Sequence, residues 1–166
     1  MAIIKPNNNT ISAITALPAA IPTGKVLQVV NGSTYTKVSS TSSTYADTGL
    51  SASITPSSTS NKVLVIVNHL ILKTNDNIYG SIKVLRDSTE LGFIGDLLCY
   101  TAEGTFNTNG ASASFLDTPS STSALNFKTQ FANLGGGGTI DVQPDSSSEN
   151  ERGRGSITLM EIAGWL

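Results

Sequence analysis

The side chains that could do chemistry in this sequence are few and far apart. There is one histidine, His69, and one cysteine, Cys99. A catalytic serine or cysteine needs a histidine base and an orienting carboxylate, and no Gly-x-Ser-x-Gly motif marks a nucleophile here. His69 lies within an apolar segment, so we interpret it as a hydrogen-bonded core or interface histidine. Cys99 lies between Leu98 and Tyr100, and we interpret it as a small apolar residue.

The sequence supports a metal or phosphate site no better than it supports a catalytic one. Zinc needs several His or Cys ligands, and the chain has only two such residues. Asp141 and Asp145 could help to hold calcium in a loop, but no Asp-x-Asp-x-Asp-Gly spacing accompanies them. The glycines at 135–138 lack the following Lys-Ser/Thr of a phosphate loop, so they predict a turn. We therefore predict no enzyme, no metal and no cofactor. A hydrolase that uses His69 remains the alternative.

The composition favours β-structure. Charged residues make up 13%, about half the usual share, and serine and threonine together account for about a quarter of the chain. Serine and threonine suit strand surfaces and turns better than exposed helix faces. A net charge of −2 with scattered basic residues argues against a nucleic-acid partner. No apolar run is long enough to span a membrane, and no secretory signal opens the chain, so we expect synthesis and assembly in the host cytoplasm.

Residues 1–23 form a region of their own. Pro6, Pro18 and Pro22 break regular structure, but too many aliphatic residues are present for a solvated tail. We interpret the region as an adhesive arm that docks onto a different protein; the alternative is a leader that folds back on its own domain. The anchoring residues that we predict are Ile3, Ile4, Ile11, Ile14, Leu17 and Ile21.

Beyond Gly24 the chain alternates between strand patterns and turn residues, which predicts one domain over residues 24–166. Asn31-Gly32 predicts a type I′ turn that ends the first strand. The expected strands are residues 25–30, 35–39, 45–55, 62–73, 79–85, 90–94, 111–116, 125–131, 139–143 and 156–163. Strands of this number and spacing predict an all-β fold, an antiparallel β-sandwich of the jelly-roll type with an extended N-terminal arm.

The segment 62–73 is apolar on both faces. Val63, Val65, Val67, His69 and Ile71 point one way, and the alternate residues point the other way. A strand of this kind is covered on both sides, by the opposing sheet and, in our interpretation, by a neighbouring subunit. The predicted subunit interface consists of Leu64, Ile66, Asn68, Leu70 and Leu72.

Several segments resemble small virion proteins of tailed bacteriophages. They are FLDTPSSTSA at residues 115–124, FKTQ at 127–130, SITLMEIA at 156–163, GKVLQVV at 24–30 and ITPSSTSNKVLV at 54–65. The likeness covers residues 24 to 163, and its motifs are strand and turn signatures. It implies a jelly-roll head that resembles the tumour-necrosis-factor-like fold, assembles as a homotrimer and is fastened to the virion surface by its N-terminal leader.

Two placements on the particle follow from the resemblance. One is a capsid decoration (cement) protein or short head fibre, bound to another virion protein such as the major capsid protein. The other is a tail fibre or tail-tip component that contacts the host. No repeat suggests a shaft, which favours decoration. A carbohydrate-binding module is a further alternative, in which Tyr35, Tyr45 or Tyr79 would stack on a host surface glycan.

Overall fold

The computed structural model describes residues 25–104, 106–144 and 153–164. Every regular element in these residues is a β-strand. The strands are β1 (Val26–Thr34), β2 (Val38–Ser40), β3 (Ala46–Ile54), β4 (Lys62–Lys73), β5 (Gly80–Arg86), β6 (Thr89–Leu98), β7 (Asn107–Asp117), β8 (Leu125–Asn133), β9 (Ile140–Val142) and β10 (Gly155–Ile162). The prediction of an all-β fold is confirmed.

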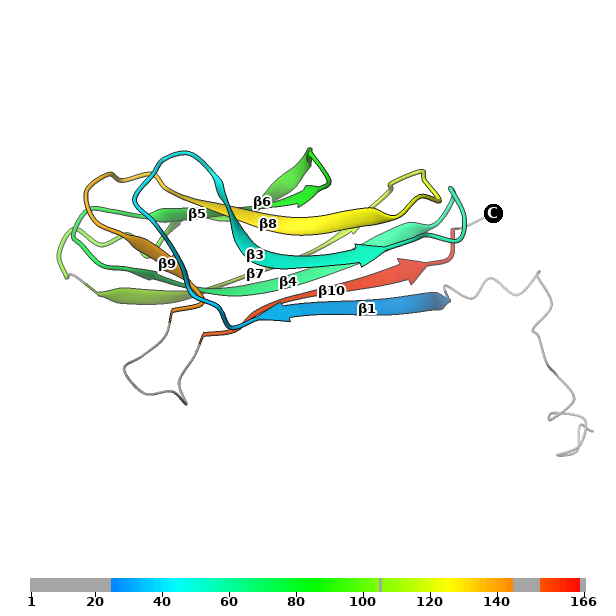
Figure 1. Ribbon diagram of the computed structural model, residues 1–166, viewed down its shortest axis with the longest axis horizontal. Coiled ribbons are helices and arrows are strands. Elements are labelled where there is room, and N and C mark those ends of the chain that lie inside the picture. The colour runs from blue at the N-terminus through cyan, green and yellow to red at the C-terminus, as the bar shows by residue number, and fades with distance from the viewer. Residues whose placement is uncertain (1–24, 105, 145–152, 165–166) are drawn as a thin grey trace, which may run out of the picture.

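The long strands form two antiparallel sheets that pack face to face (Figure 1). One has the order β1-β10-β4-β7, and the other has the order β3-β8-β5-β6. Because the chain crosses repeatedly from one sheet to the other, this is the strand order of a jelly roll. The short strands β9 and β2 extend the first sheet, since β9 pairs with β4 beyond the end of β10. The predicted antiparallel jelly-roll sandwich is thus confirmed.

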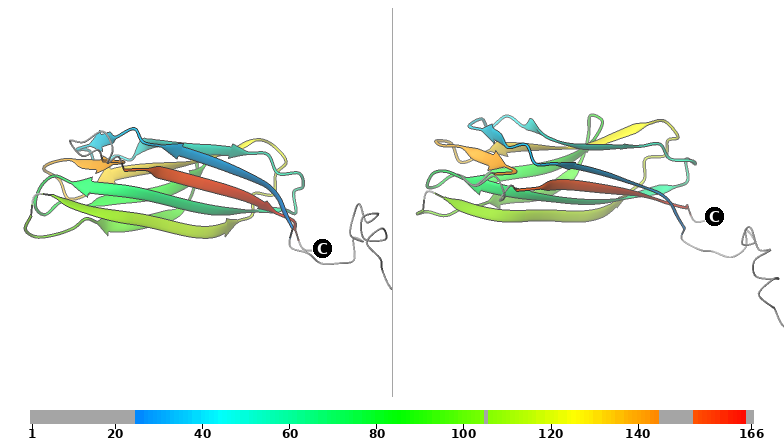
Figure 2. Two further views of the ribbon diagram at one scale, coloured as in Figure 1. Left: turned by 90° about the horizontal axis from the view of Figure 1, so that it is seen from below. Right: turned by 60° about the horizontal axis from the view of Figure 1, so that its bottom comes forward.

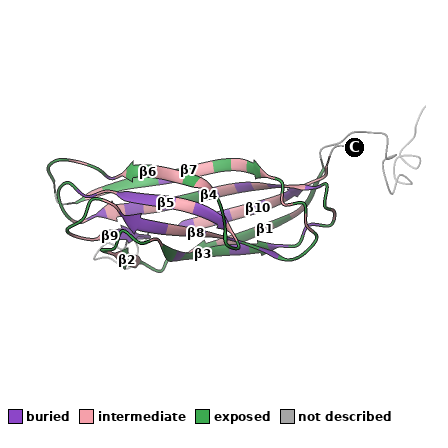
Figure 3. Ribbon diagram, turned by 90° about the horizontal axis from the view of Figure 1, so that it is seen from above, coloured by how far each residue is buried: buried purple, intermediate pink, exposed green. Residues whose placement is uncertain are grey.

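The core lies between the sheets and has two clusters. Val63, Val65 and Val67 of β4 are fully buried against Phe127 of β8 in one of them. Phe131 belongs to the other, with Ile71 and Ile82 among its neighbours. Figure 3 shows this burial running along the middle of the sandwich, whereas β6 and β7 alternate between exposed and half-buried residues. Strand alternation therefore places one residue in two in the core, as the sequence predicted for β4.

One predicted turn is wrong. Asn31-Gly32 lies inside β1, which continues to Thr34 in register with β10. The Asn31 side chain donates to the carbonyl of Ile157 and to the hydroxyl of Thr158, so neighbouring strands satisfy its amide. A Cβ on Gly32 would lie 2.1 Å from the carbonyl oxygen of Ser51. The glycine therefore allows a close approach of two backbones, and it does not supply turn geometry.

The strands predicted at residues 79–85 and 90–94 are present as β5 and β6, which form a hairpin paired from Gly80 to Leu98. The glycine run is also a turn, as predicted, because Gly136, Gly137 and Gly138 all have positive φ angles. By contrast, β7 begins four residues earlier than expected, at Asn107. Its first residues are polar, and they are strand because they pair with Leu70–Lys73 of β4.

Candidate functional site

The five residues that we predicted as a subunit interface lie on one strand, β4, and point away from the core. Leu64, Ile66, Leu70 and Leu72 are half-buried and Asn68 is exposed, while the residues between them are buried. The structure therefore places all five on the outer face of the sheet β1-β10-β4-β7. That a second subunit covers this face remains a prediction.

Strand register adds residues that the sequence analysis missed. Val29 of β1 pairs with Met160 of β10, Met160 pairs with Leu64 of β4, and Leu64 pairs with Leu116 of β7. We call these four residues the apolar row. Val29 is 56% exposed and Leu116 is 49% exposed. An apolar row that crosses a whole sheet, with exposed side chains at both ends and half-buried ones between them, is typical of a surface that binds another protein.

The rest of this outer face carries almost no charge. The next row along the sheet is Asn31, Thr158, Ile66 and Ser114, and the one after it is Ser33, Ser156, Asn68 and Ser112. Among the described outward positions of these four strands, Lys62 carries the one charge. Apart from Lys62, such a surface can be taken out of water without burying an ion.

The outer face of the other sheet differs in kind. Asp47 of β3 accepts hydrogen bonds from Lys128 and Gln130 of β8, and Lys83 of β5 pairs with Glu90 of β6 at 3.0 Å. The hydrogen bond from Gln130 lowers the pKa of the Asp47 carboxyl most, Lys128 lowers it further, and partial burial opposes both. This face is therefore adapted to water.

A buried carboxylate lies beneath the outer face of the sheet β1-β10-β4-β7. Glu161 of β10 is 1% exposed and accepts hydrogen bonds from Gln28 Nε2 at 2.6 Å, Asn61 Nδ2 at 2.5 Å, and the Ser57 backbone N–H and hydroxyl at 2.6 and 2.8 Å. Burial raises the pKa of the Glu161 carboxyl, but these hydrogen bonds outweigh burial and bring it to about 2. Glu161 thus ties β1, β10 and the turn before β4 together.

His69 is a structural residue, as interpreted from the sequence. It is 3% exposed, and its Nε2 lies 2.9 Å from the hydroxyl of Thr129, which in turn contacts Thr48. Its Nδ1 lies 2.8 Å from the Gln143 amide, and the amide orientation that satisfies all partners makes the Gln143 oxygen the acceptor. Burial lowers the pKa of His69 to about 4, so the ring is neutral. Neither ring nitrogen contacts a carboxylate that could orient a catalytic base.

Cys99 is likewise a core residue. It is 1% exposed, and its thiol donates to the carbonyl of Ile71 at 3.3 Å. Burial raises the pKa of the thiol above its usual value, which disfavours the reactive thiolate. In the part of the chain that the structure describes, no group of three or more His, Cys, Asp or Glu side chains could hold a metal. Helices that could cross a membrane are also absent from that part.

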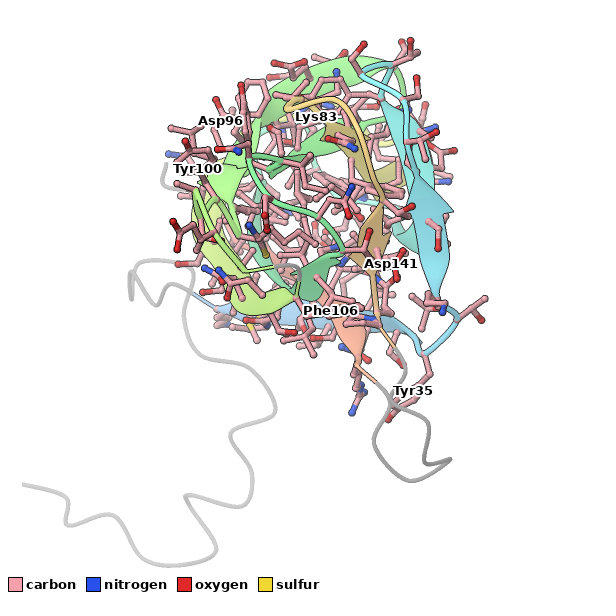
Figure 4. All side chains as sticks on the ribbon, turned by 90° about the vertical axis from the view of Figure 1, so that its left-hand side faces the viewer. Tyr35, Lys83, Asp96, Tyr100, Phe106 and Asp141 are labelled. Atoms are coloured by element: carbon pink, nitrogen blue, oxygen red, sulfur yellow. The ribbon has the colours of Figure 1, made fainter. Side chains whose placement is uncertain are left out.

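The aromatic residues proposed for glycan stacking do not form one platform. Tyr45 lies under the ammonium of Lys83, and its hydroxyl contacts Ser81. Tyr79 packs edge-on against Tyr100. Tyr35 is 50% exposed, and Figure 4 shows it well away from Tyr100 on the same end of the molecule. Three separate settings give a sugar chain no continuous aromatic surface.

The predicted anchoring residues, Ile3, Ile4, Ile11, Ile14, Leu17 and Ile21, lie outside the described residues. The described part of the chain begins at Lys25, soon after this region. Lys25 leads directly into β1, and β1 begins at the same end of the sandwich at which β10 finishes (Figure 1). Since Val29 is near the start of β1, the apolar row lies toward this end.

Comparison with known proteins gives a likeness of architecture alone. No protein family model matches the chain, and no curated protein matches it. Among solved structures, the Gx strain of infectious bursal disease virus has a similar chain, with a TM-score of 0.44 and 15% identity over 82% of this chain and 37% of that one. The VP2 subviral particle of the same virus is similar at a TM-score of 0.45 and 12% identity, over 90% and 42%. This chain spans less than half the length of either, and nothing about function follows from the likeness.

Proposed function

We propose that this protein is a structural component of a bacteriophage virion, a homotrimeric capsid decoration protein or short head fibre that is attached through residues 1–23. The observation that carries the proposal is the outer face of the sheet β1-β10-β4-β7, which has the apolar row across it and Lys62 as its one charge among the described outward positions. The resemblance of its segments to virion proteins of tailed bacteriophages supports the viral setting. The role is assembly, with other copies of the chain and with a larger virion protein.

Charge distribution supports this role. A stable contact between subunits removes apolar surface from water at about 25 cal/mol per Å², and its core is depleted of charged residues. The apolar row meets both conditions, and the ion-paired face of the other sheet meets neither. The trimer is therefore built with Leu64 and its row near the three-fold axis, and the ion-paired face turned to solvent.

The chain path supports attachment at one end. β1 begins at Val26, close to the apolar row, so copies grouped around that row start β1, and with it the point of attachment of the arm, at one end of the assembly. Three weak attachments on one rigid body bind far more tightly than one, because after the first contact the others are intramolecular. This multivalent attachment suits a protein that cements a shell.

Two experiments test the proposal. Cryo-electron microscopy of intact particles locates the protein, and density spread over the capsid lattice is the expected result. Density confined to the tail would instead support a tail fibre or tail-tip role. Deletion of residues 1–23 is expected to leave a soluble trimer that no longer binds particles. Undiminished binding by this shortened protein would refute attachment through the arm.

A further inference from the structure

The four long edge strands, β1, β7, β3 and β6, are not equally protected against pairing with another chain. An edge strand presents unpaired backbone N–H and C=O groups, and proteins guard such edges with charges, prolines, bulges or covering segments. β6 is guarded, because its pairing with β5 is interrupted by three register shifts and it carries Glu90 and Asp96. β3 is guarded by a register shift between Asp47 and Ser51, with Gly49 at φ 80° between them.

β1 is irregular at its start and lies close to the opposite sheet near its end. Its register with β10 shifts between Val26 and Gln28, at its very start. At Gly32 it runs so close to β3 that a Cβ there would meet the backbone of Ser51. Beyond the register shift, β1 offers seven residues in regular register, from Gln28 to Thr34, against eleven in β7.

β7 is the longest of the four strands and has no register shift. It pairs with β4 through eleven consecutive residues, from Asn107 to Asp117, with no register shift. It contains no proline, and Asp117 at its end is its one charged residue. Figure 2 shows β7 at the outer margin of its sheet, next to β4. A strand this long and regular, with its one charge at its end, is suited to pair with another strand along its free side.

We propose that β7 pairs antiparallel with β7 of a second copy of this chain, about a two-fold axis at Ser112. Ser112 is the middle residue of the strand, so this is the one register in which all eleven residues find a partner. Gly110 then lies opposite Ser114 of the partner subunit, and Asn107 lies opposite Asp117 of the partner subunit. The two sheets join into a continuous sheet of eight long strands.

Charge favours a second copy as the occupant. The carboxylate of Asp117 is already paired with Arg86 of its own chain. In the proposed register it faces an asparagine, so the two Asp117 residues lie at opposite ends of the contact. Like charges directly opposite each other would destabilise such a pair, and this register has none.

Side-chain size and direction favour the same occupant. The exposed side chains near the axis are small, with Gly110, Ser112 and Ser114 on the outer face. In the proposed register, each even-numbered residue of one β7 lies opposite an even-numbered residue of the other. The outer face of one copy therefore continues as the outer face of the other. The contact lies at the sheet edge, so it goes beyond the proposed trimer and joins one trimer to the next.

Cysteine cross-linking of the full chain tests the pairing. Under mild oxidation, Ser112→Cys is expected to form a covalent dimer, because the two sulfurs meet at the axis. Wild type is the blank, since Cys99 is buried. Ser53→Cys, at an exposed position on the guarded edge strand β3, is the matched control. A yield for Ser112→Cys that does not exceed the yield for Ser53→Cys overturns the proposal.

A mixture tests the register. Gly110→Cys and Ser114→Cys, one of them carrying a size tag, are expected to give the mixed covalent dimer in preference to either homodimer. A Cβ at Gly110 meets nothing within 4 Å, so the glycine can be replaced without strain. Absence of the mixed dimer overturns the register. Neither result depends on the trimer, which is measured separately through Leu64.

Discussion

The two sheets of this sandwich keep their charges in opposite places. The sheet β3-β8-β5-β6 carries ion pairs on its outer face, with Asp47 and Lys128 as one example. The sheet β1-β10-β4-β7 has Lys62 as the one charge among the described outward positions of its outer face, and it buries Glu161 and Lys73 within the fold. Lys73 is completely buried, and its ammonium donates to the carbonyl of Thr101 at 2.9 Å. The sheet β1-β10-β4-β7 therefore does have charged side chains, but they lie inside the fold, where they are hydrogen-bonded.

This difference shows which face is built for water and which is built for contact. Exposed ion pairs contribute little to stability, but they keep a surface soluble. Buried charges are costly unless they are fully hydrogen-bonded, and Glu161 receives four such bonds. We therefore expect other protein subunits to bind on the outer face of the sheet β1-β10-β4-β7.

The largest expected effect is on association. Leu64→Lys puts a charge into the centre of the apolar row, and three copies of it meet in the proposed trimer. We expect loss of the trimer, measured as a fall to the monomer mass by light scattering. Leu116→Lys, at the end of the row, should act the same way, while Lys128→Leu on the opposite face serves as the matched control and should leave the trimer intact. A trimer that survives both lysine substitutions would contradict an interface on this face.

The next effect is a loss of stability as pH falls. His69 is neutral in the folded protein with a pKa of about 4, whereas in the unfolded chain it binds a proton near its ordinary value of 6.5. The unfolded state therefore binds more protons in this window, and stability present above pH 6.5 declines as pH falls toward 4, by up to roughly 3 kcal/mol. Urea midpoints across this range measure the decline. His69→Gln should flatten the profile there, and an equally steep profile in that variant would exclude His69 as its cause.

A smaller loss is expected from Glu161→Gln. The substituted amide cannot accept all four hydrogen bonds and places an NH₂ group against donors, which should lower the free energy of unfolding by about 2 kcal/mol. Because the folded pKa of Glu161 is depressed to about 2 from 4.5, its contribution is present above pH 4.5 and is lost as pH falls toward 2. Chemical denaturation of both proteins at neutral and at acid pH should show a difference that shrinks at the lower pH. A difference that did not depend on pH would mean that shape, and not charge, is what the site requires.

The smallest effect belongs to the ion-paired face. Lys128→Ala removes the 3.0 Å contact with Asp47, whose side chain is 54% exposed. Exposed pairs of this kind contribute at most about 1 kcal/mol and are screened by salt. At both low and high ionic strength, the melting temperature of the variant should lie close to that of the wild type. A loss as large as that of Glu161→Gln would remove the distinction between the two sheets.

Much of the fold could be predicted from local patterns. The alternation in residues 62–73 predicted both the bounds of β4 and the separation of its buried and outward residues. The interpretation of His69 and Cys99 as core residues also followed, because each lies among apolar neighbours. The Asn31-Gly32 turn was wrong because the dipeptide favours a turn only when no neighbouring strand offers its backbone better pairing. The start of β7 was missed because its residues are polar and show no strand pattern of their own. They are strand because they pair with β4.

The sequence alone determined the fold class, the two faces of β4 and the scarcity of groups that could do chemistry, because these depend on residue type and on spacing along the chain. Only the tertiary structure decided that Val29, Met160, Leu64 and Leu116 form one row, since they come from four strands whose register the sequence does not contain. It also decided that Glu161 has its partners in β1 and in the turn before β4. Non-local pairing brings such residues together, and no local pattern records it.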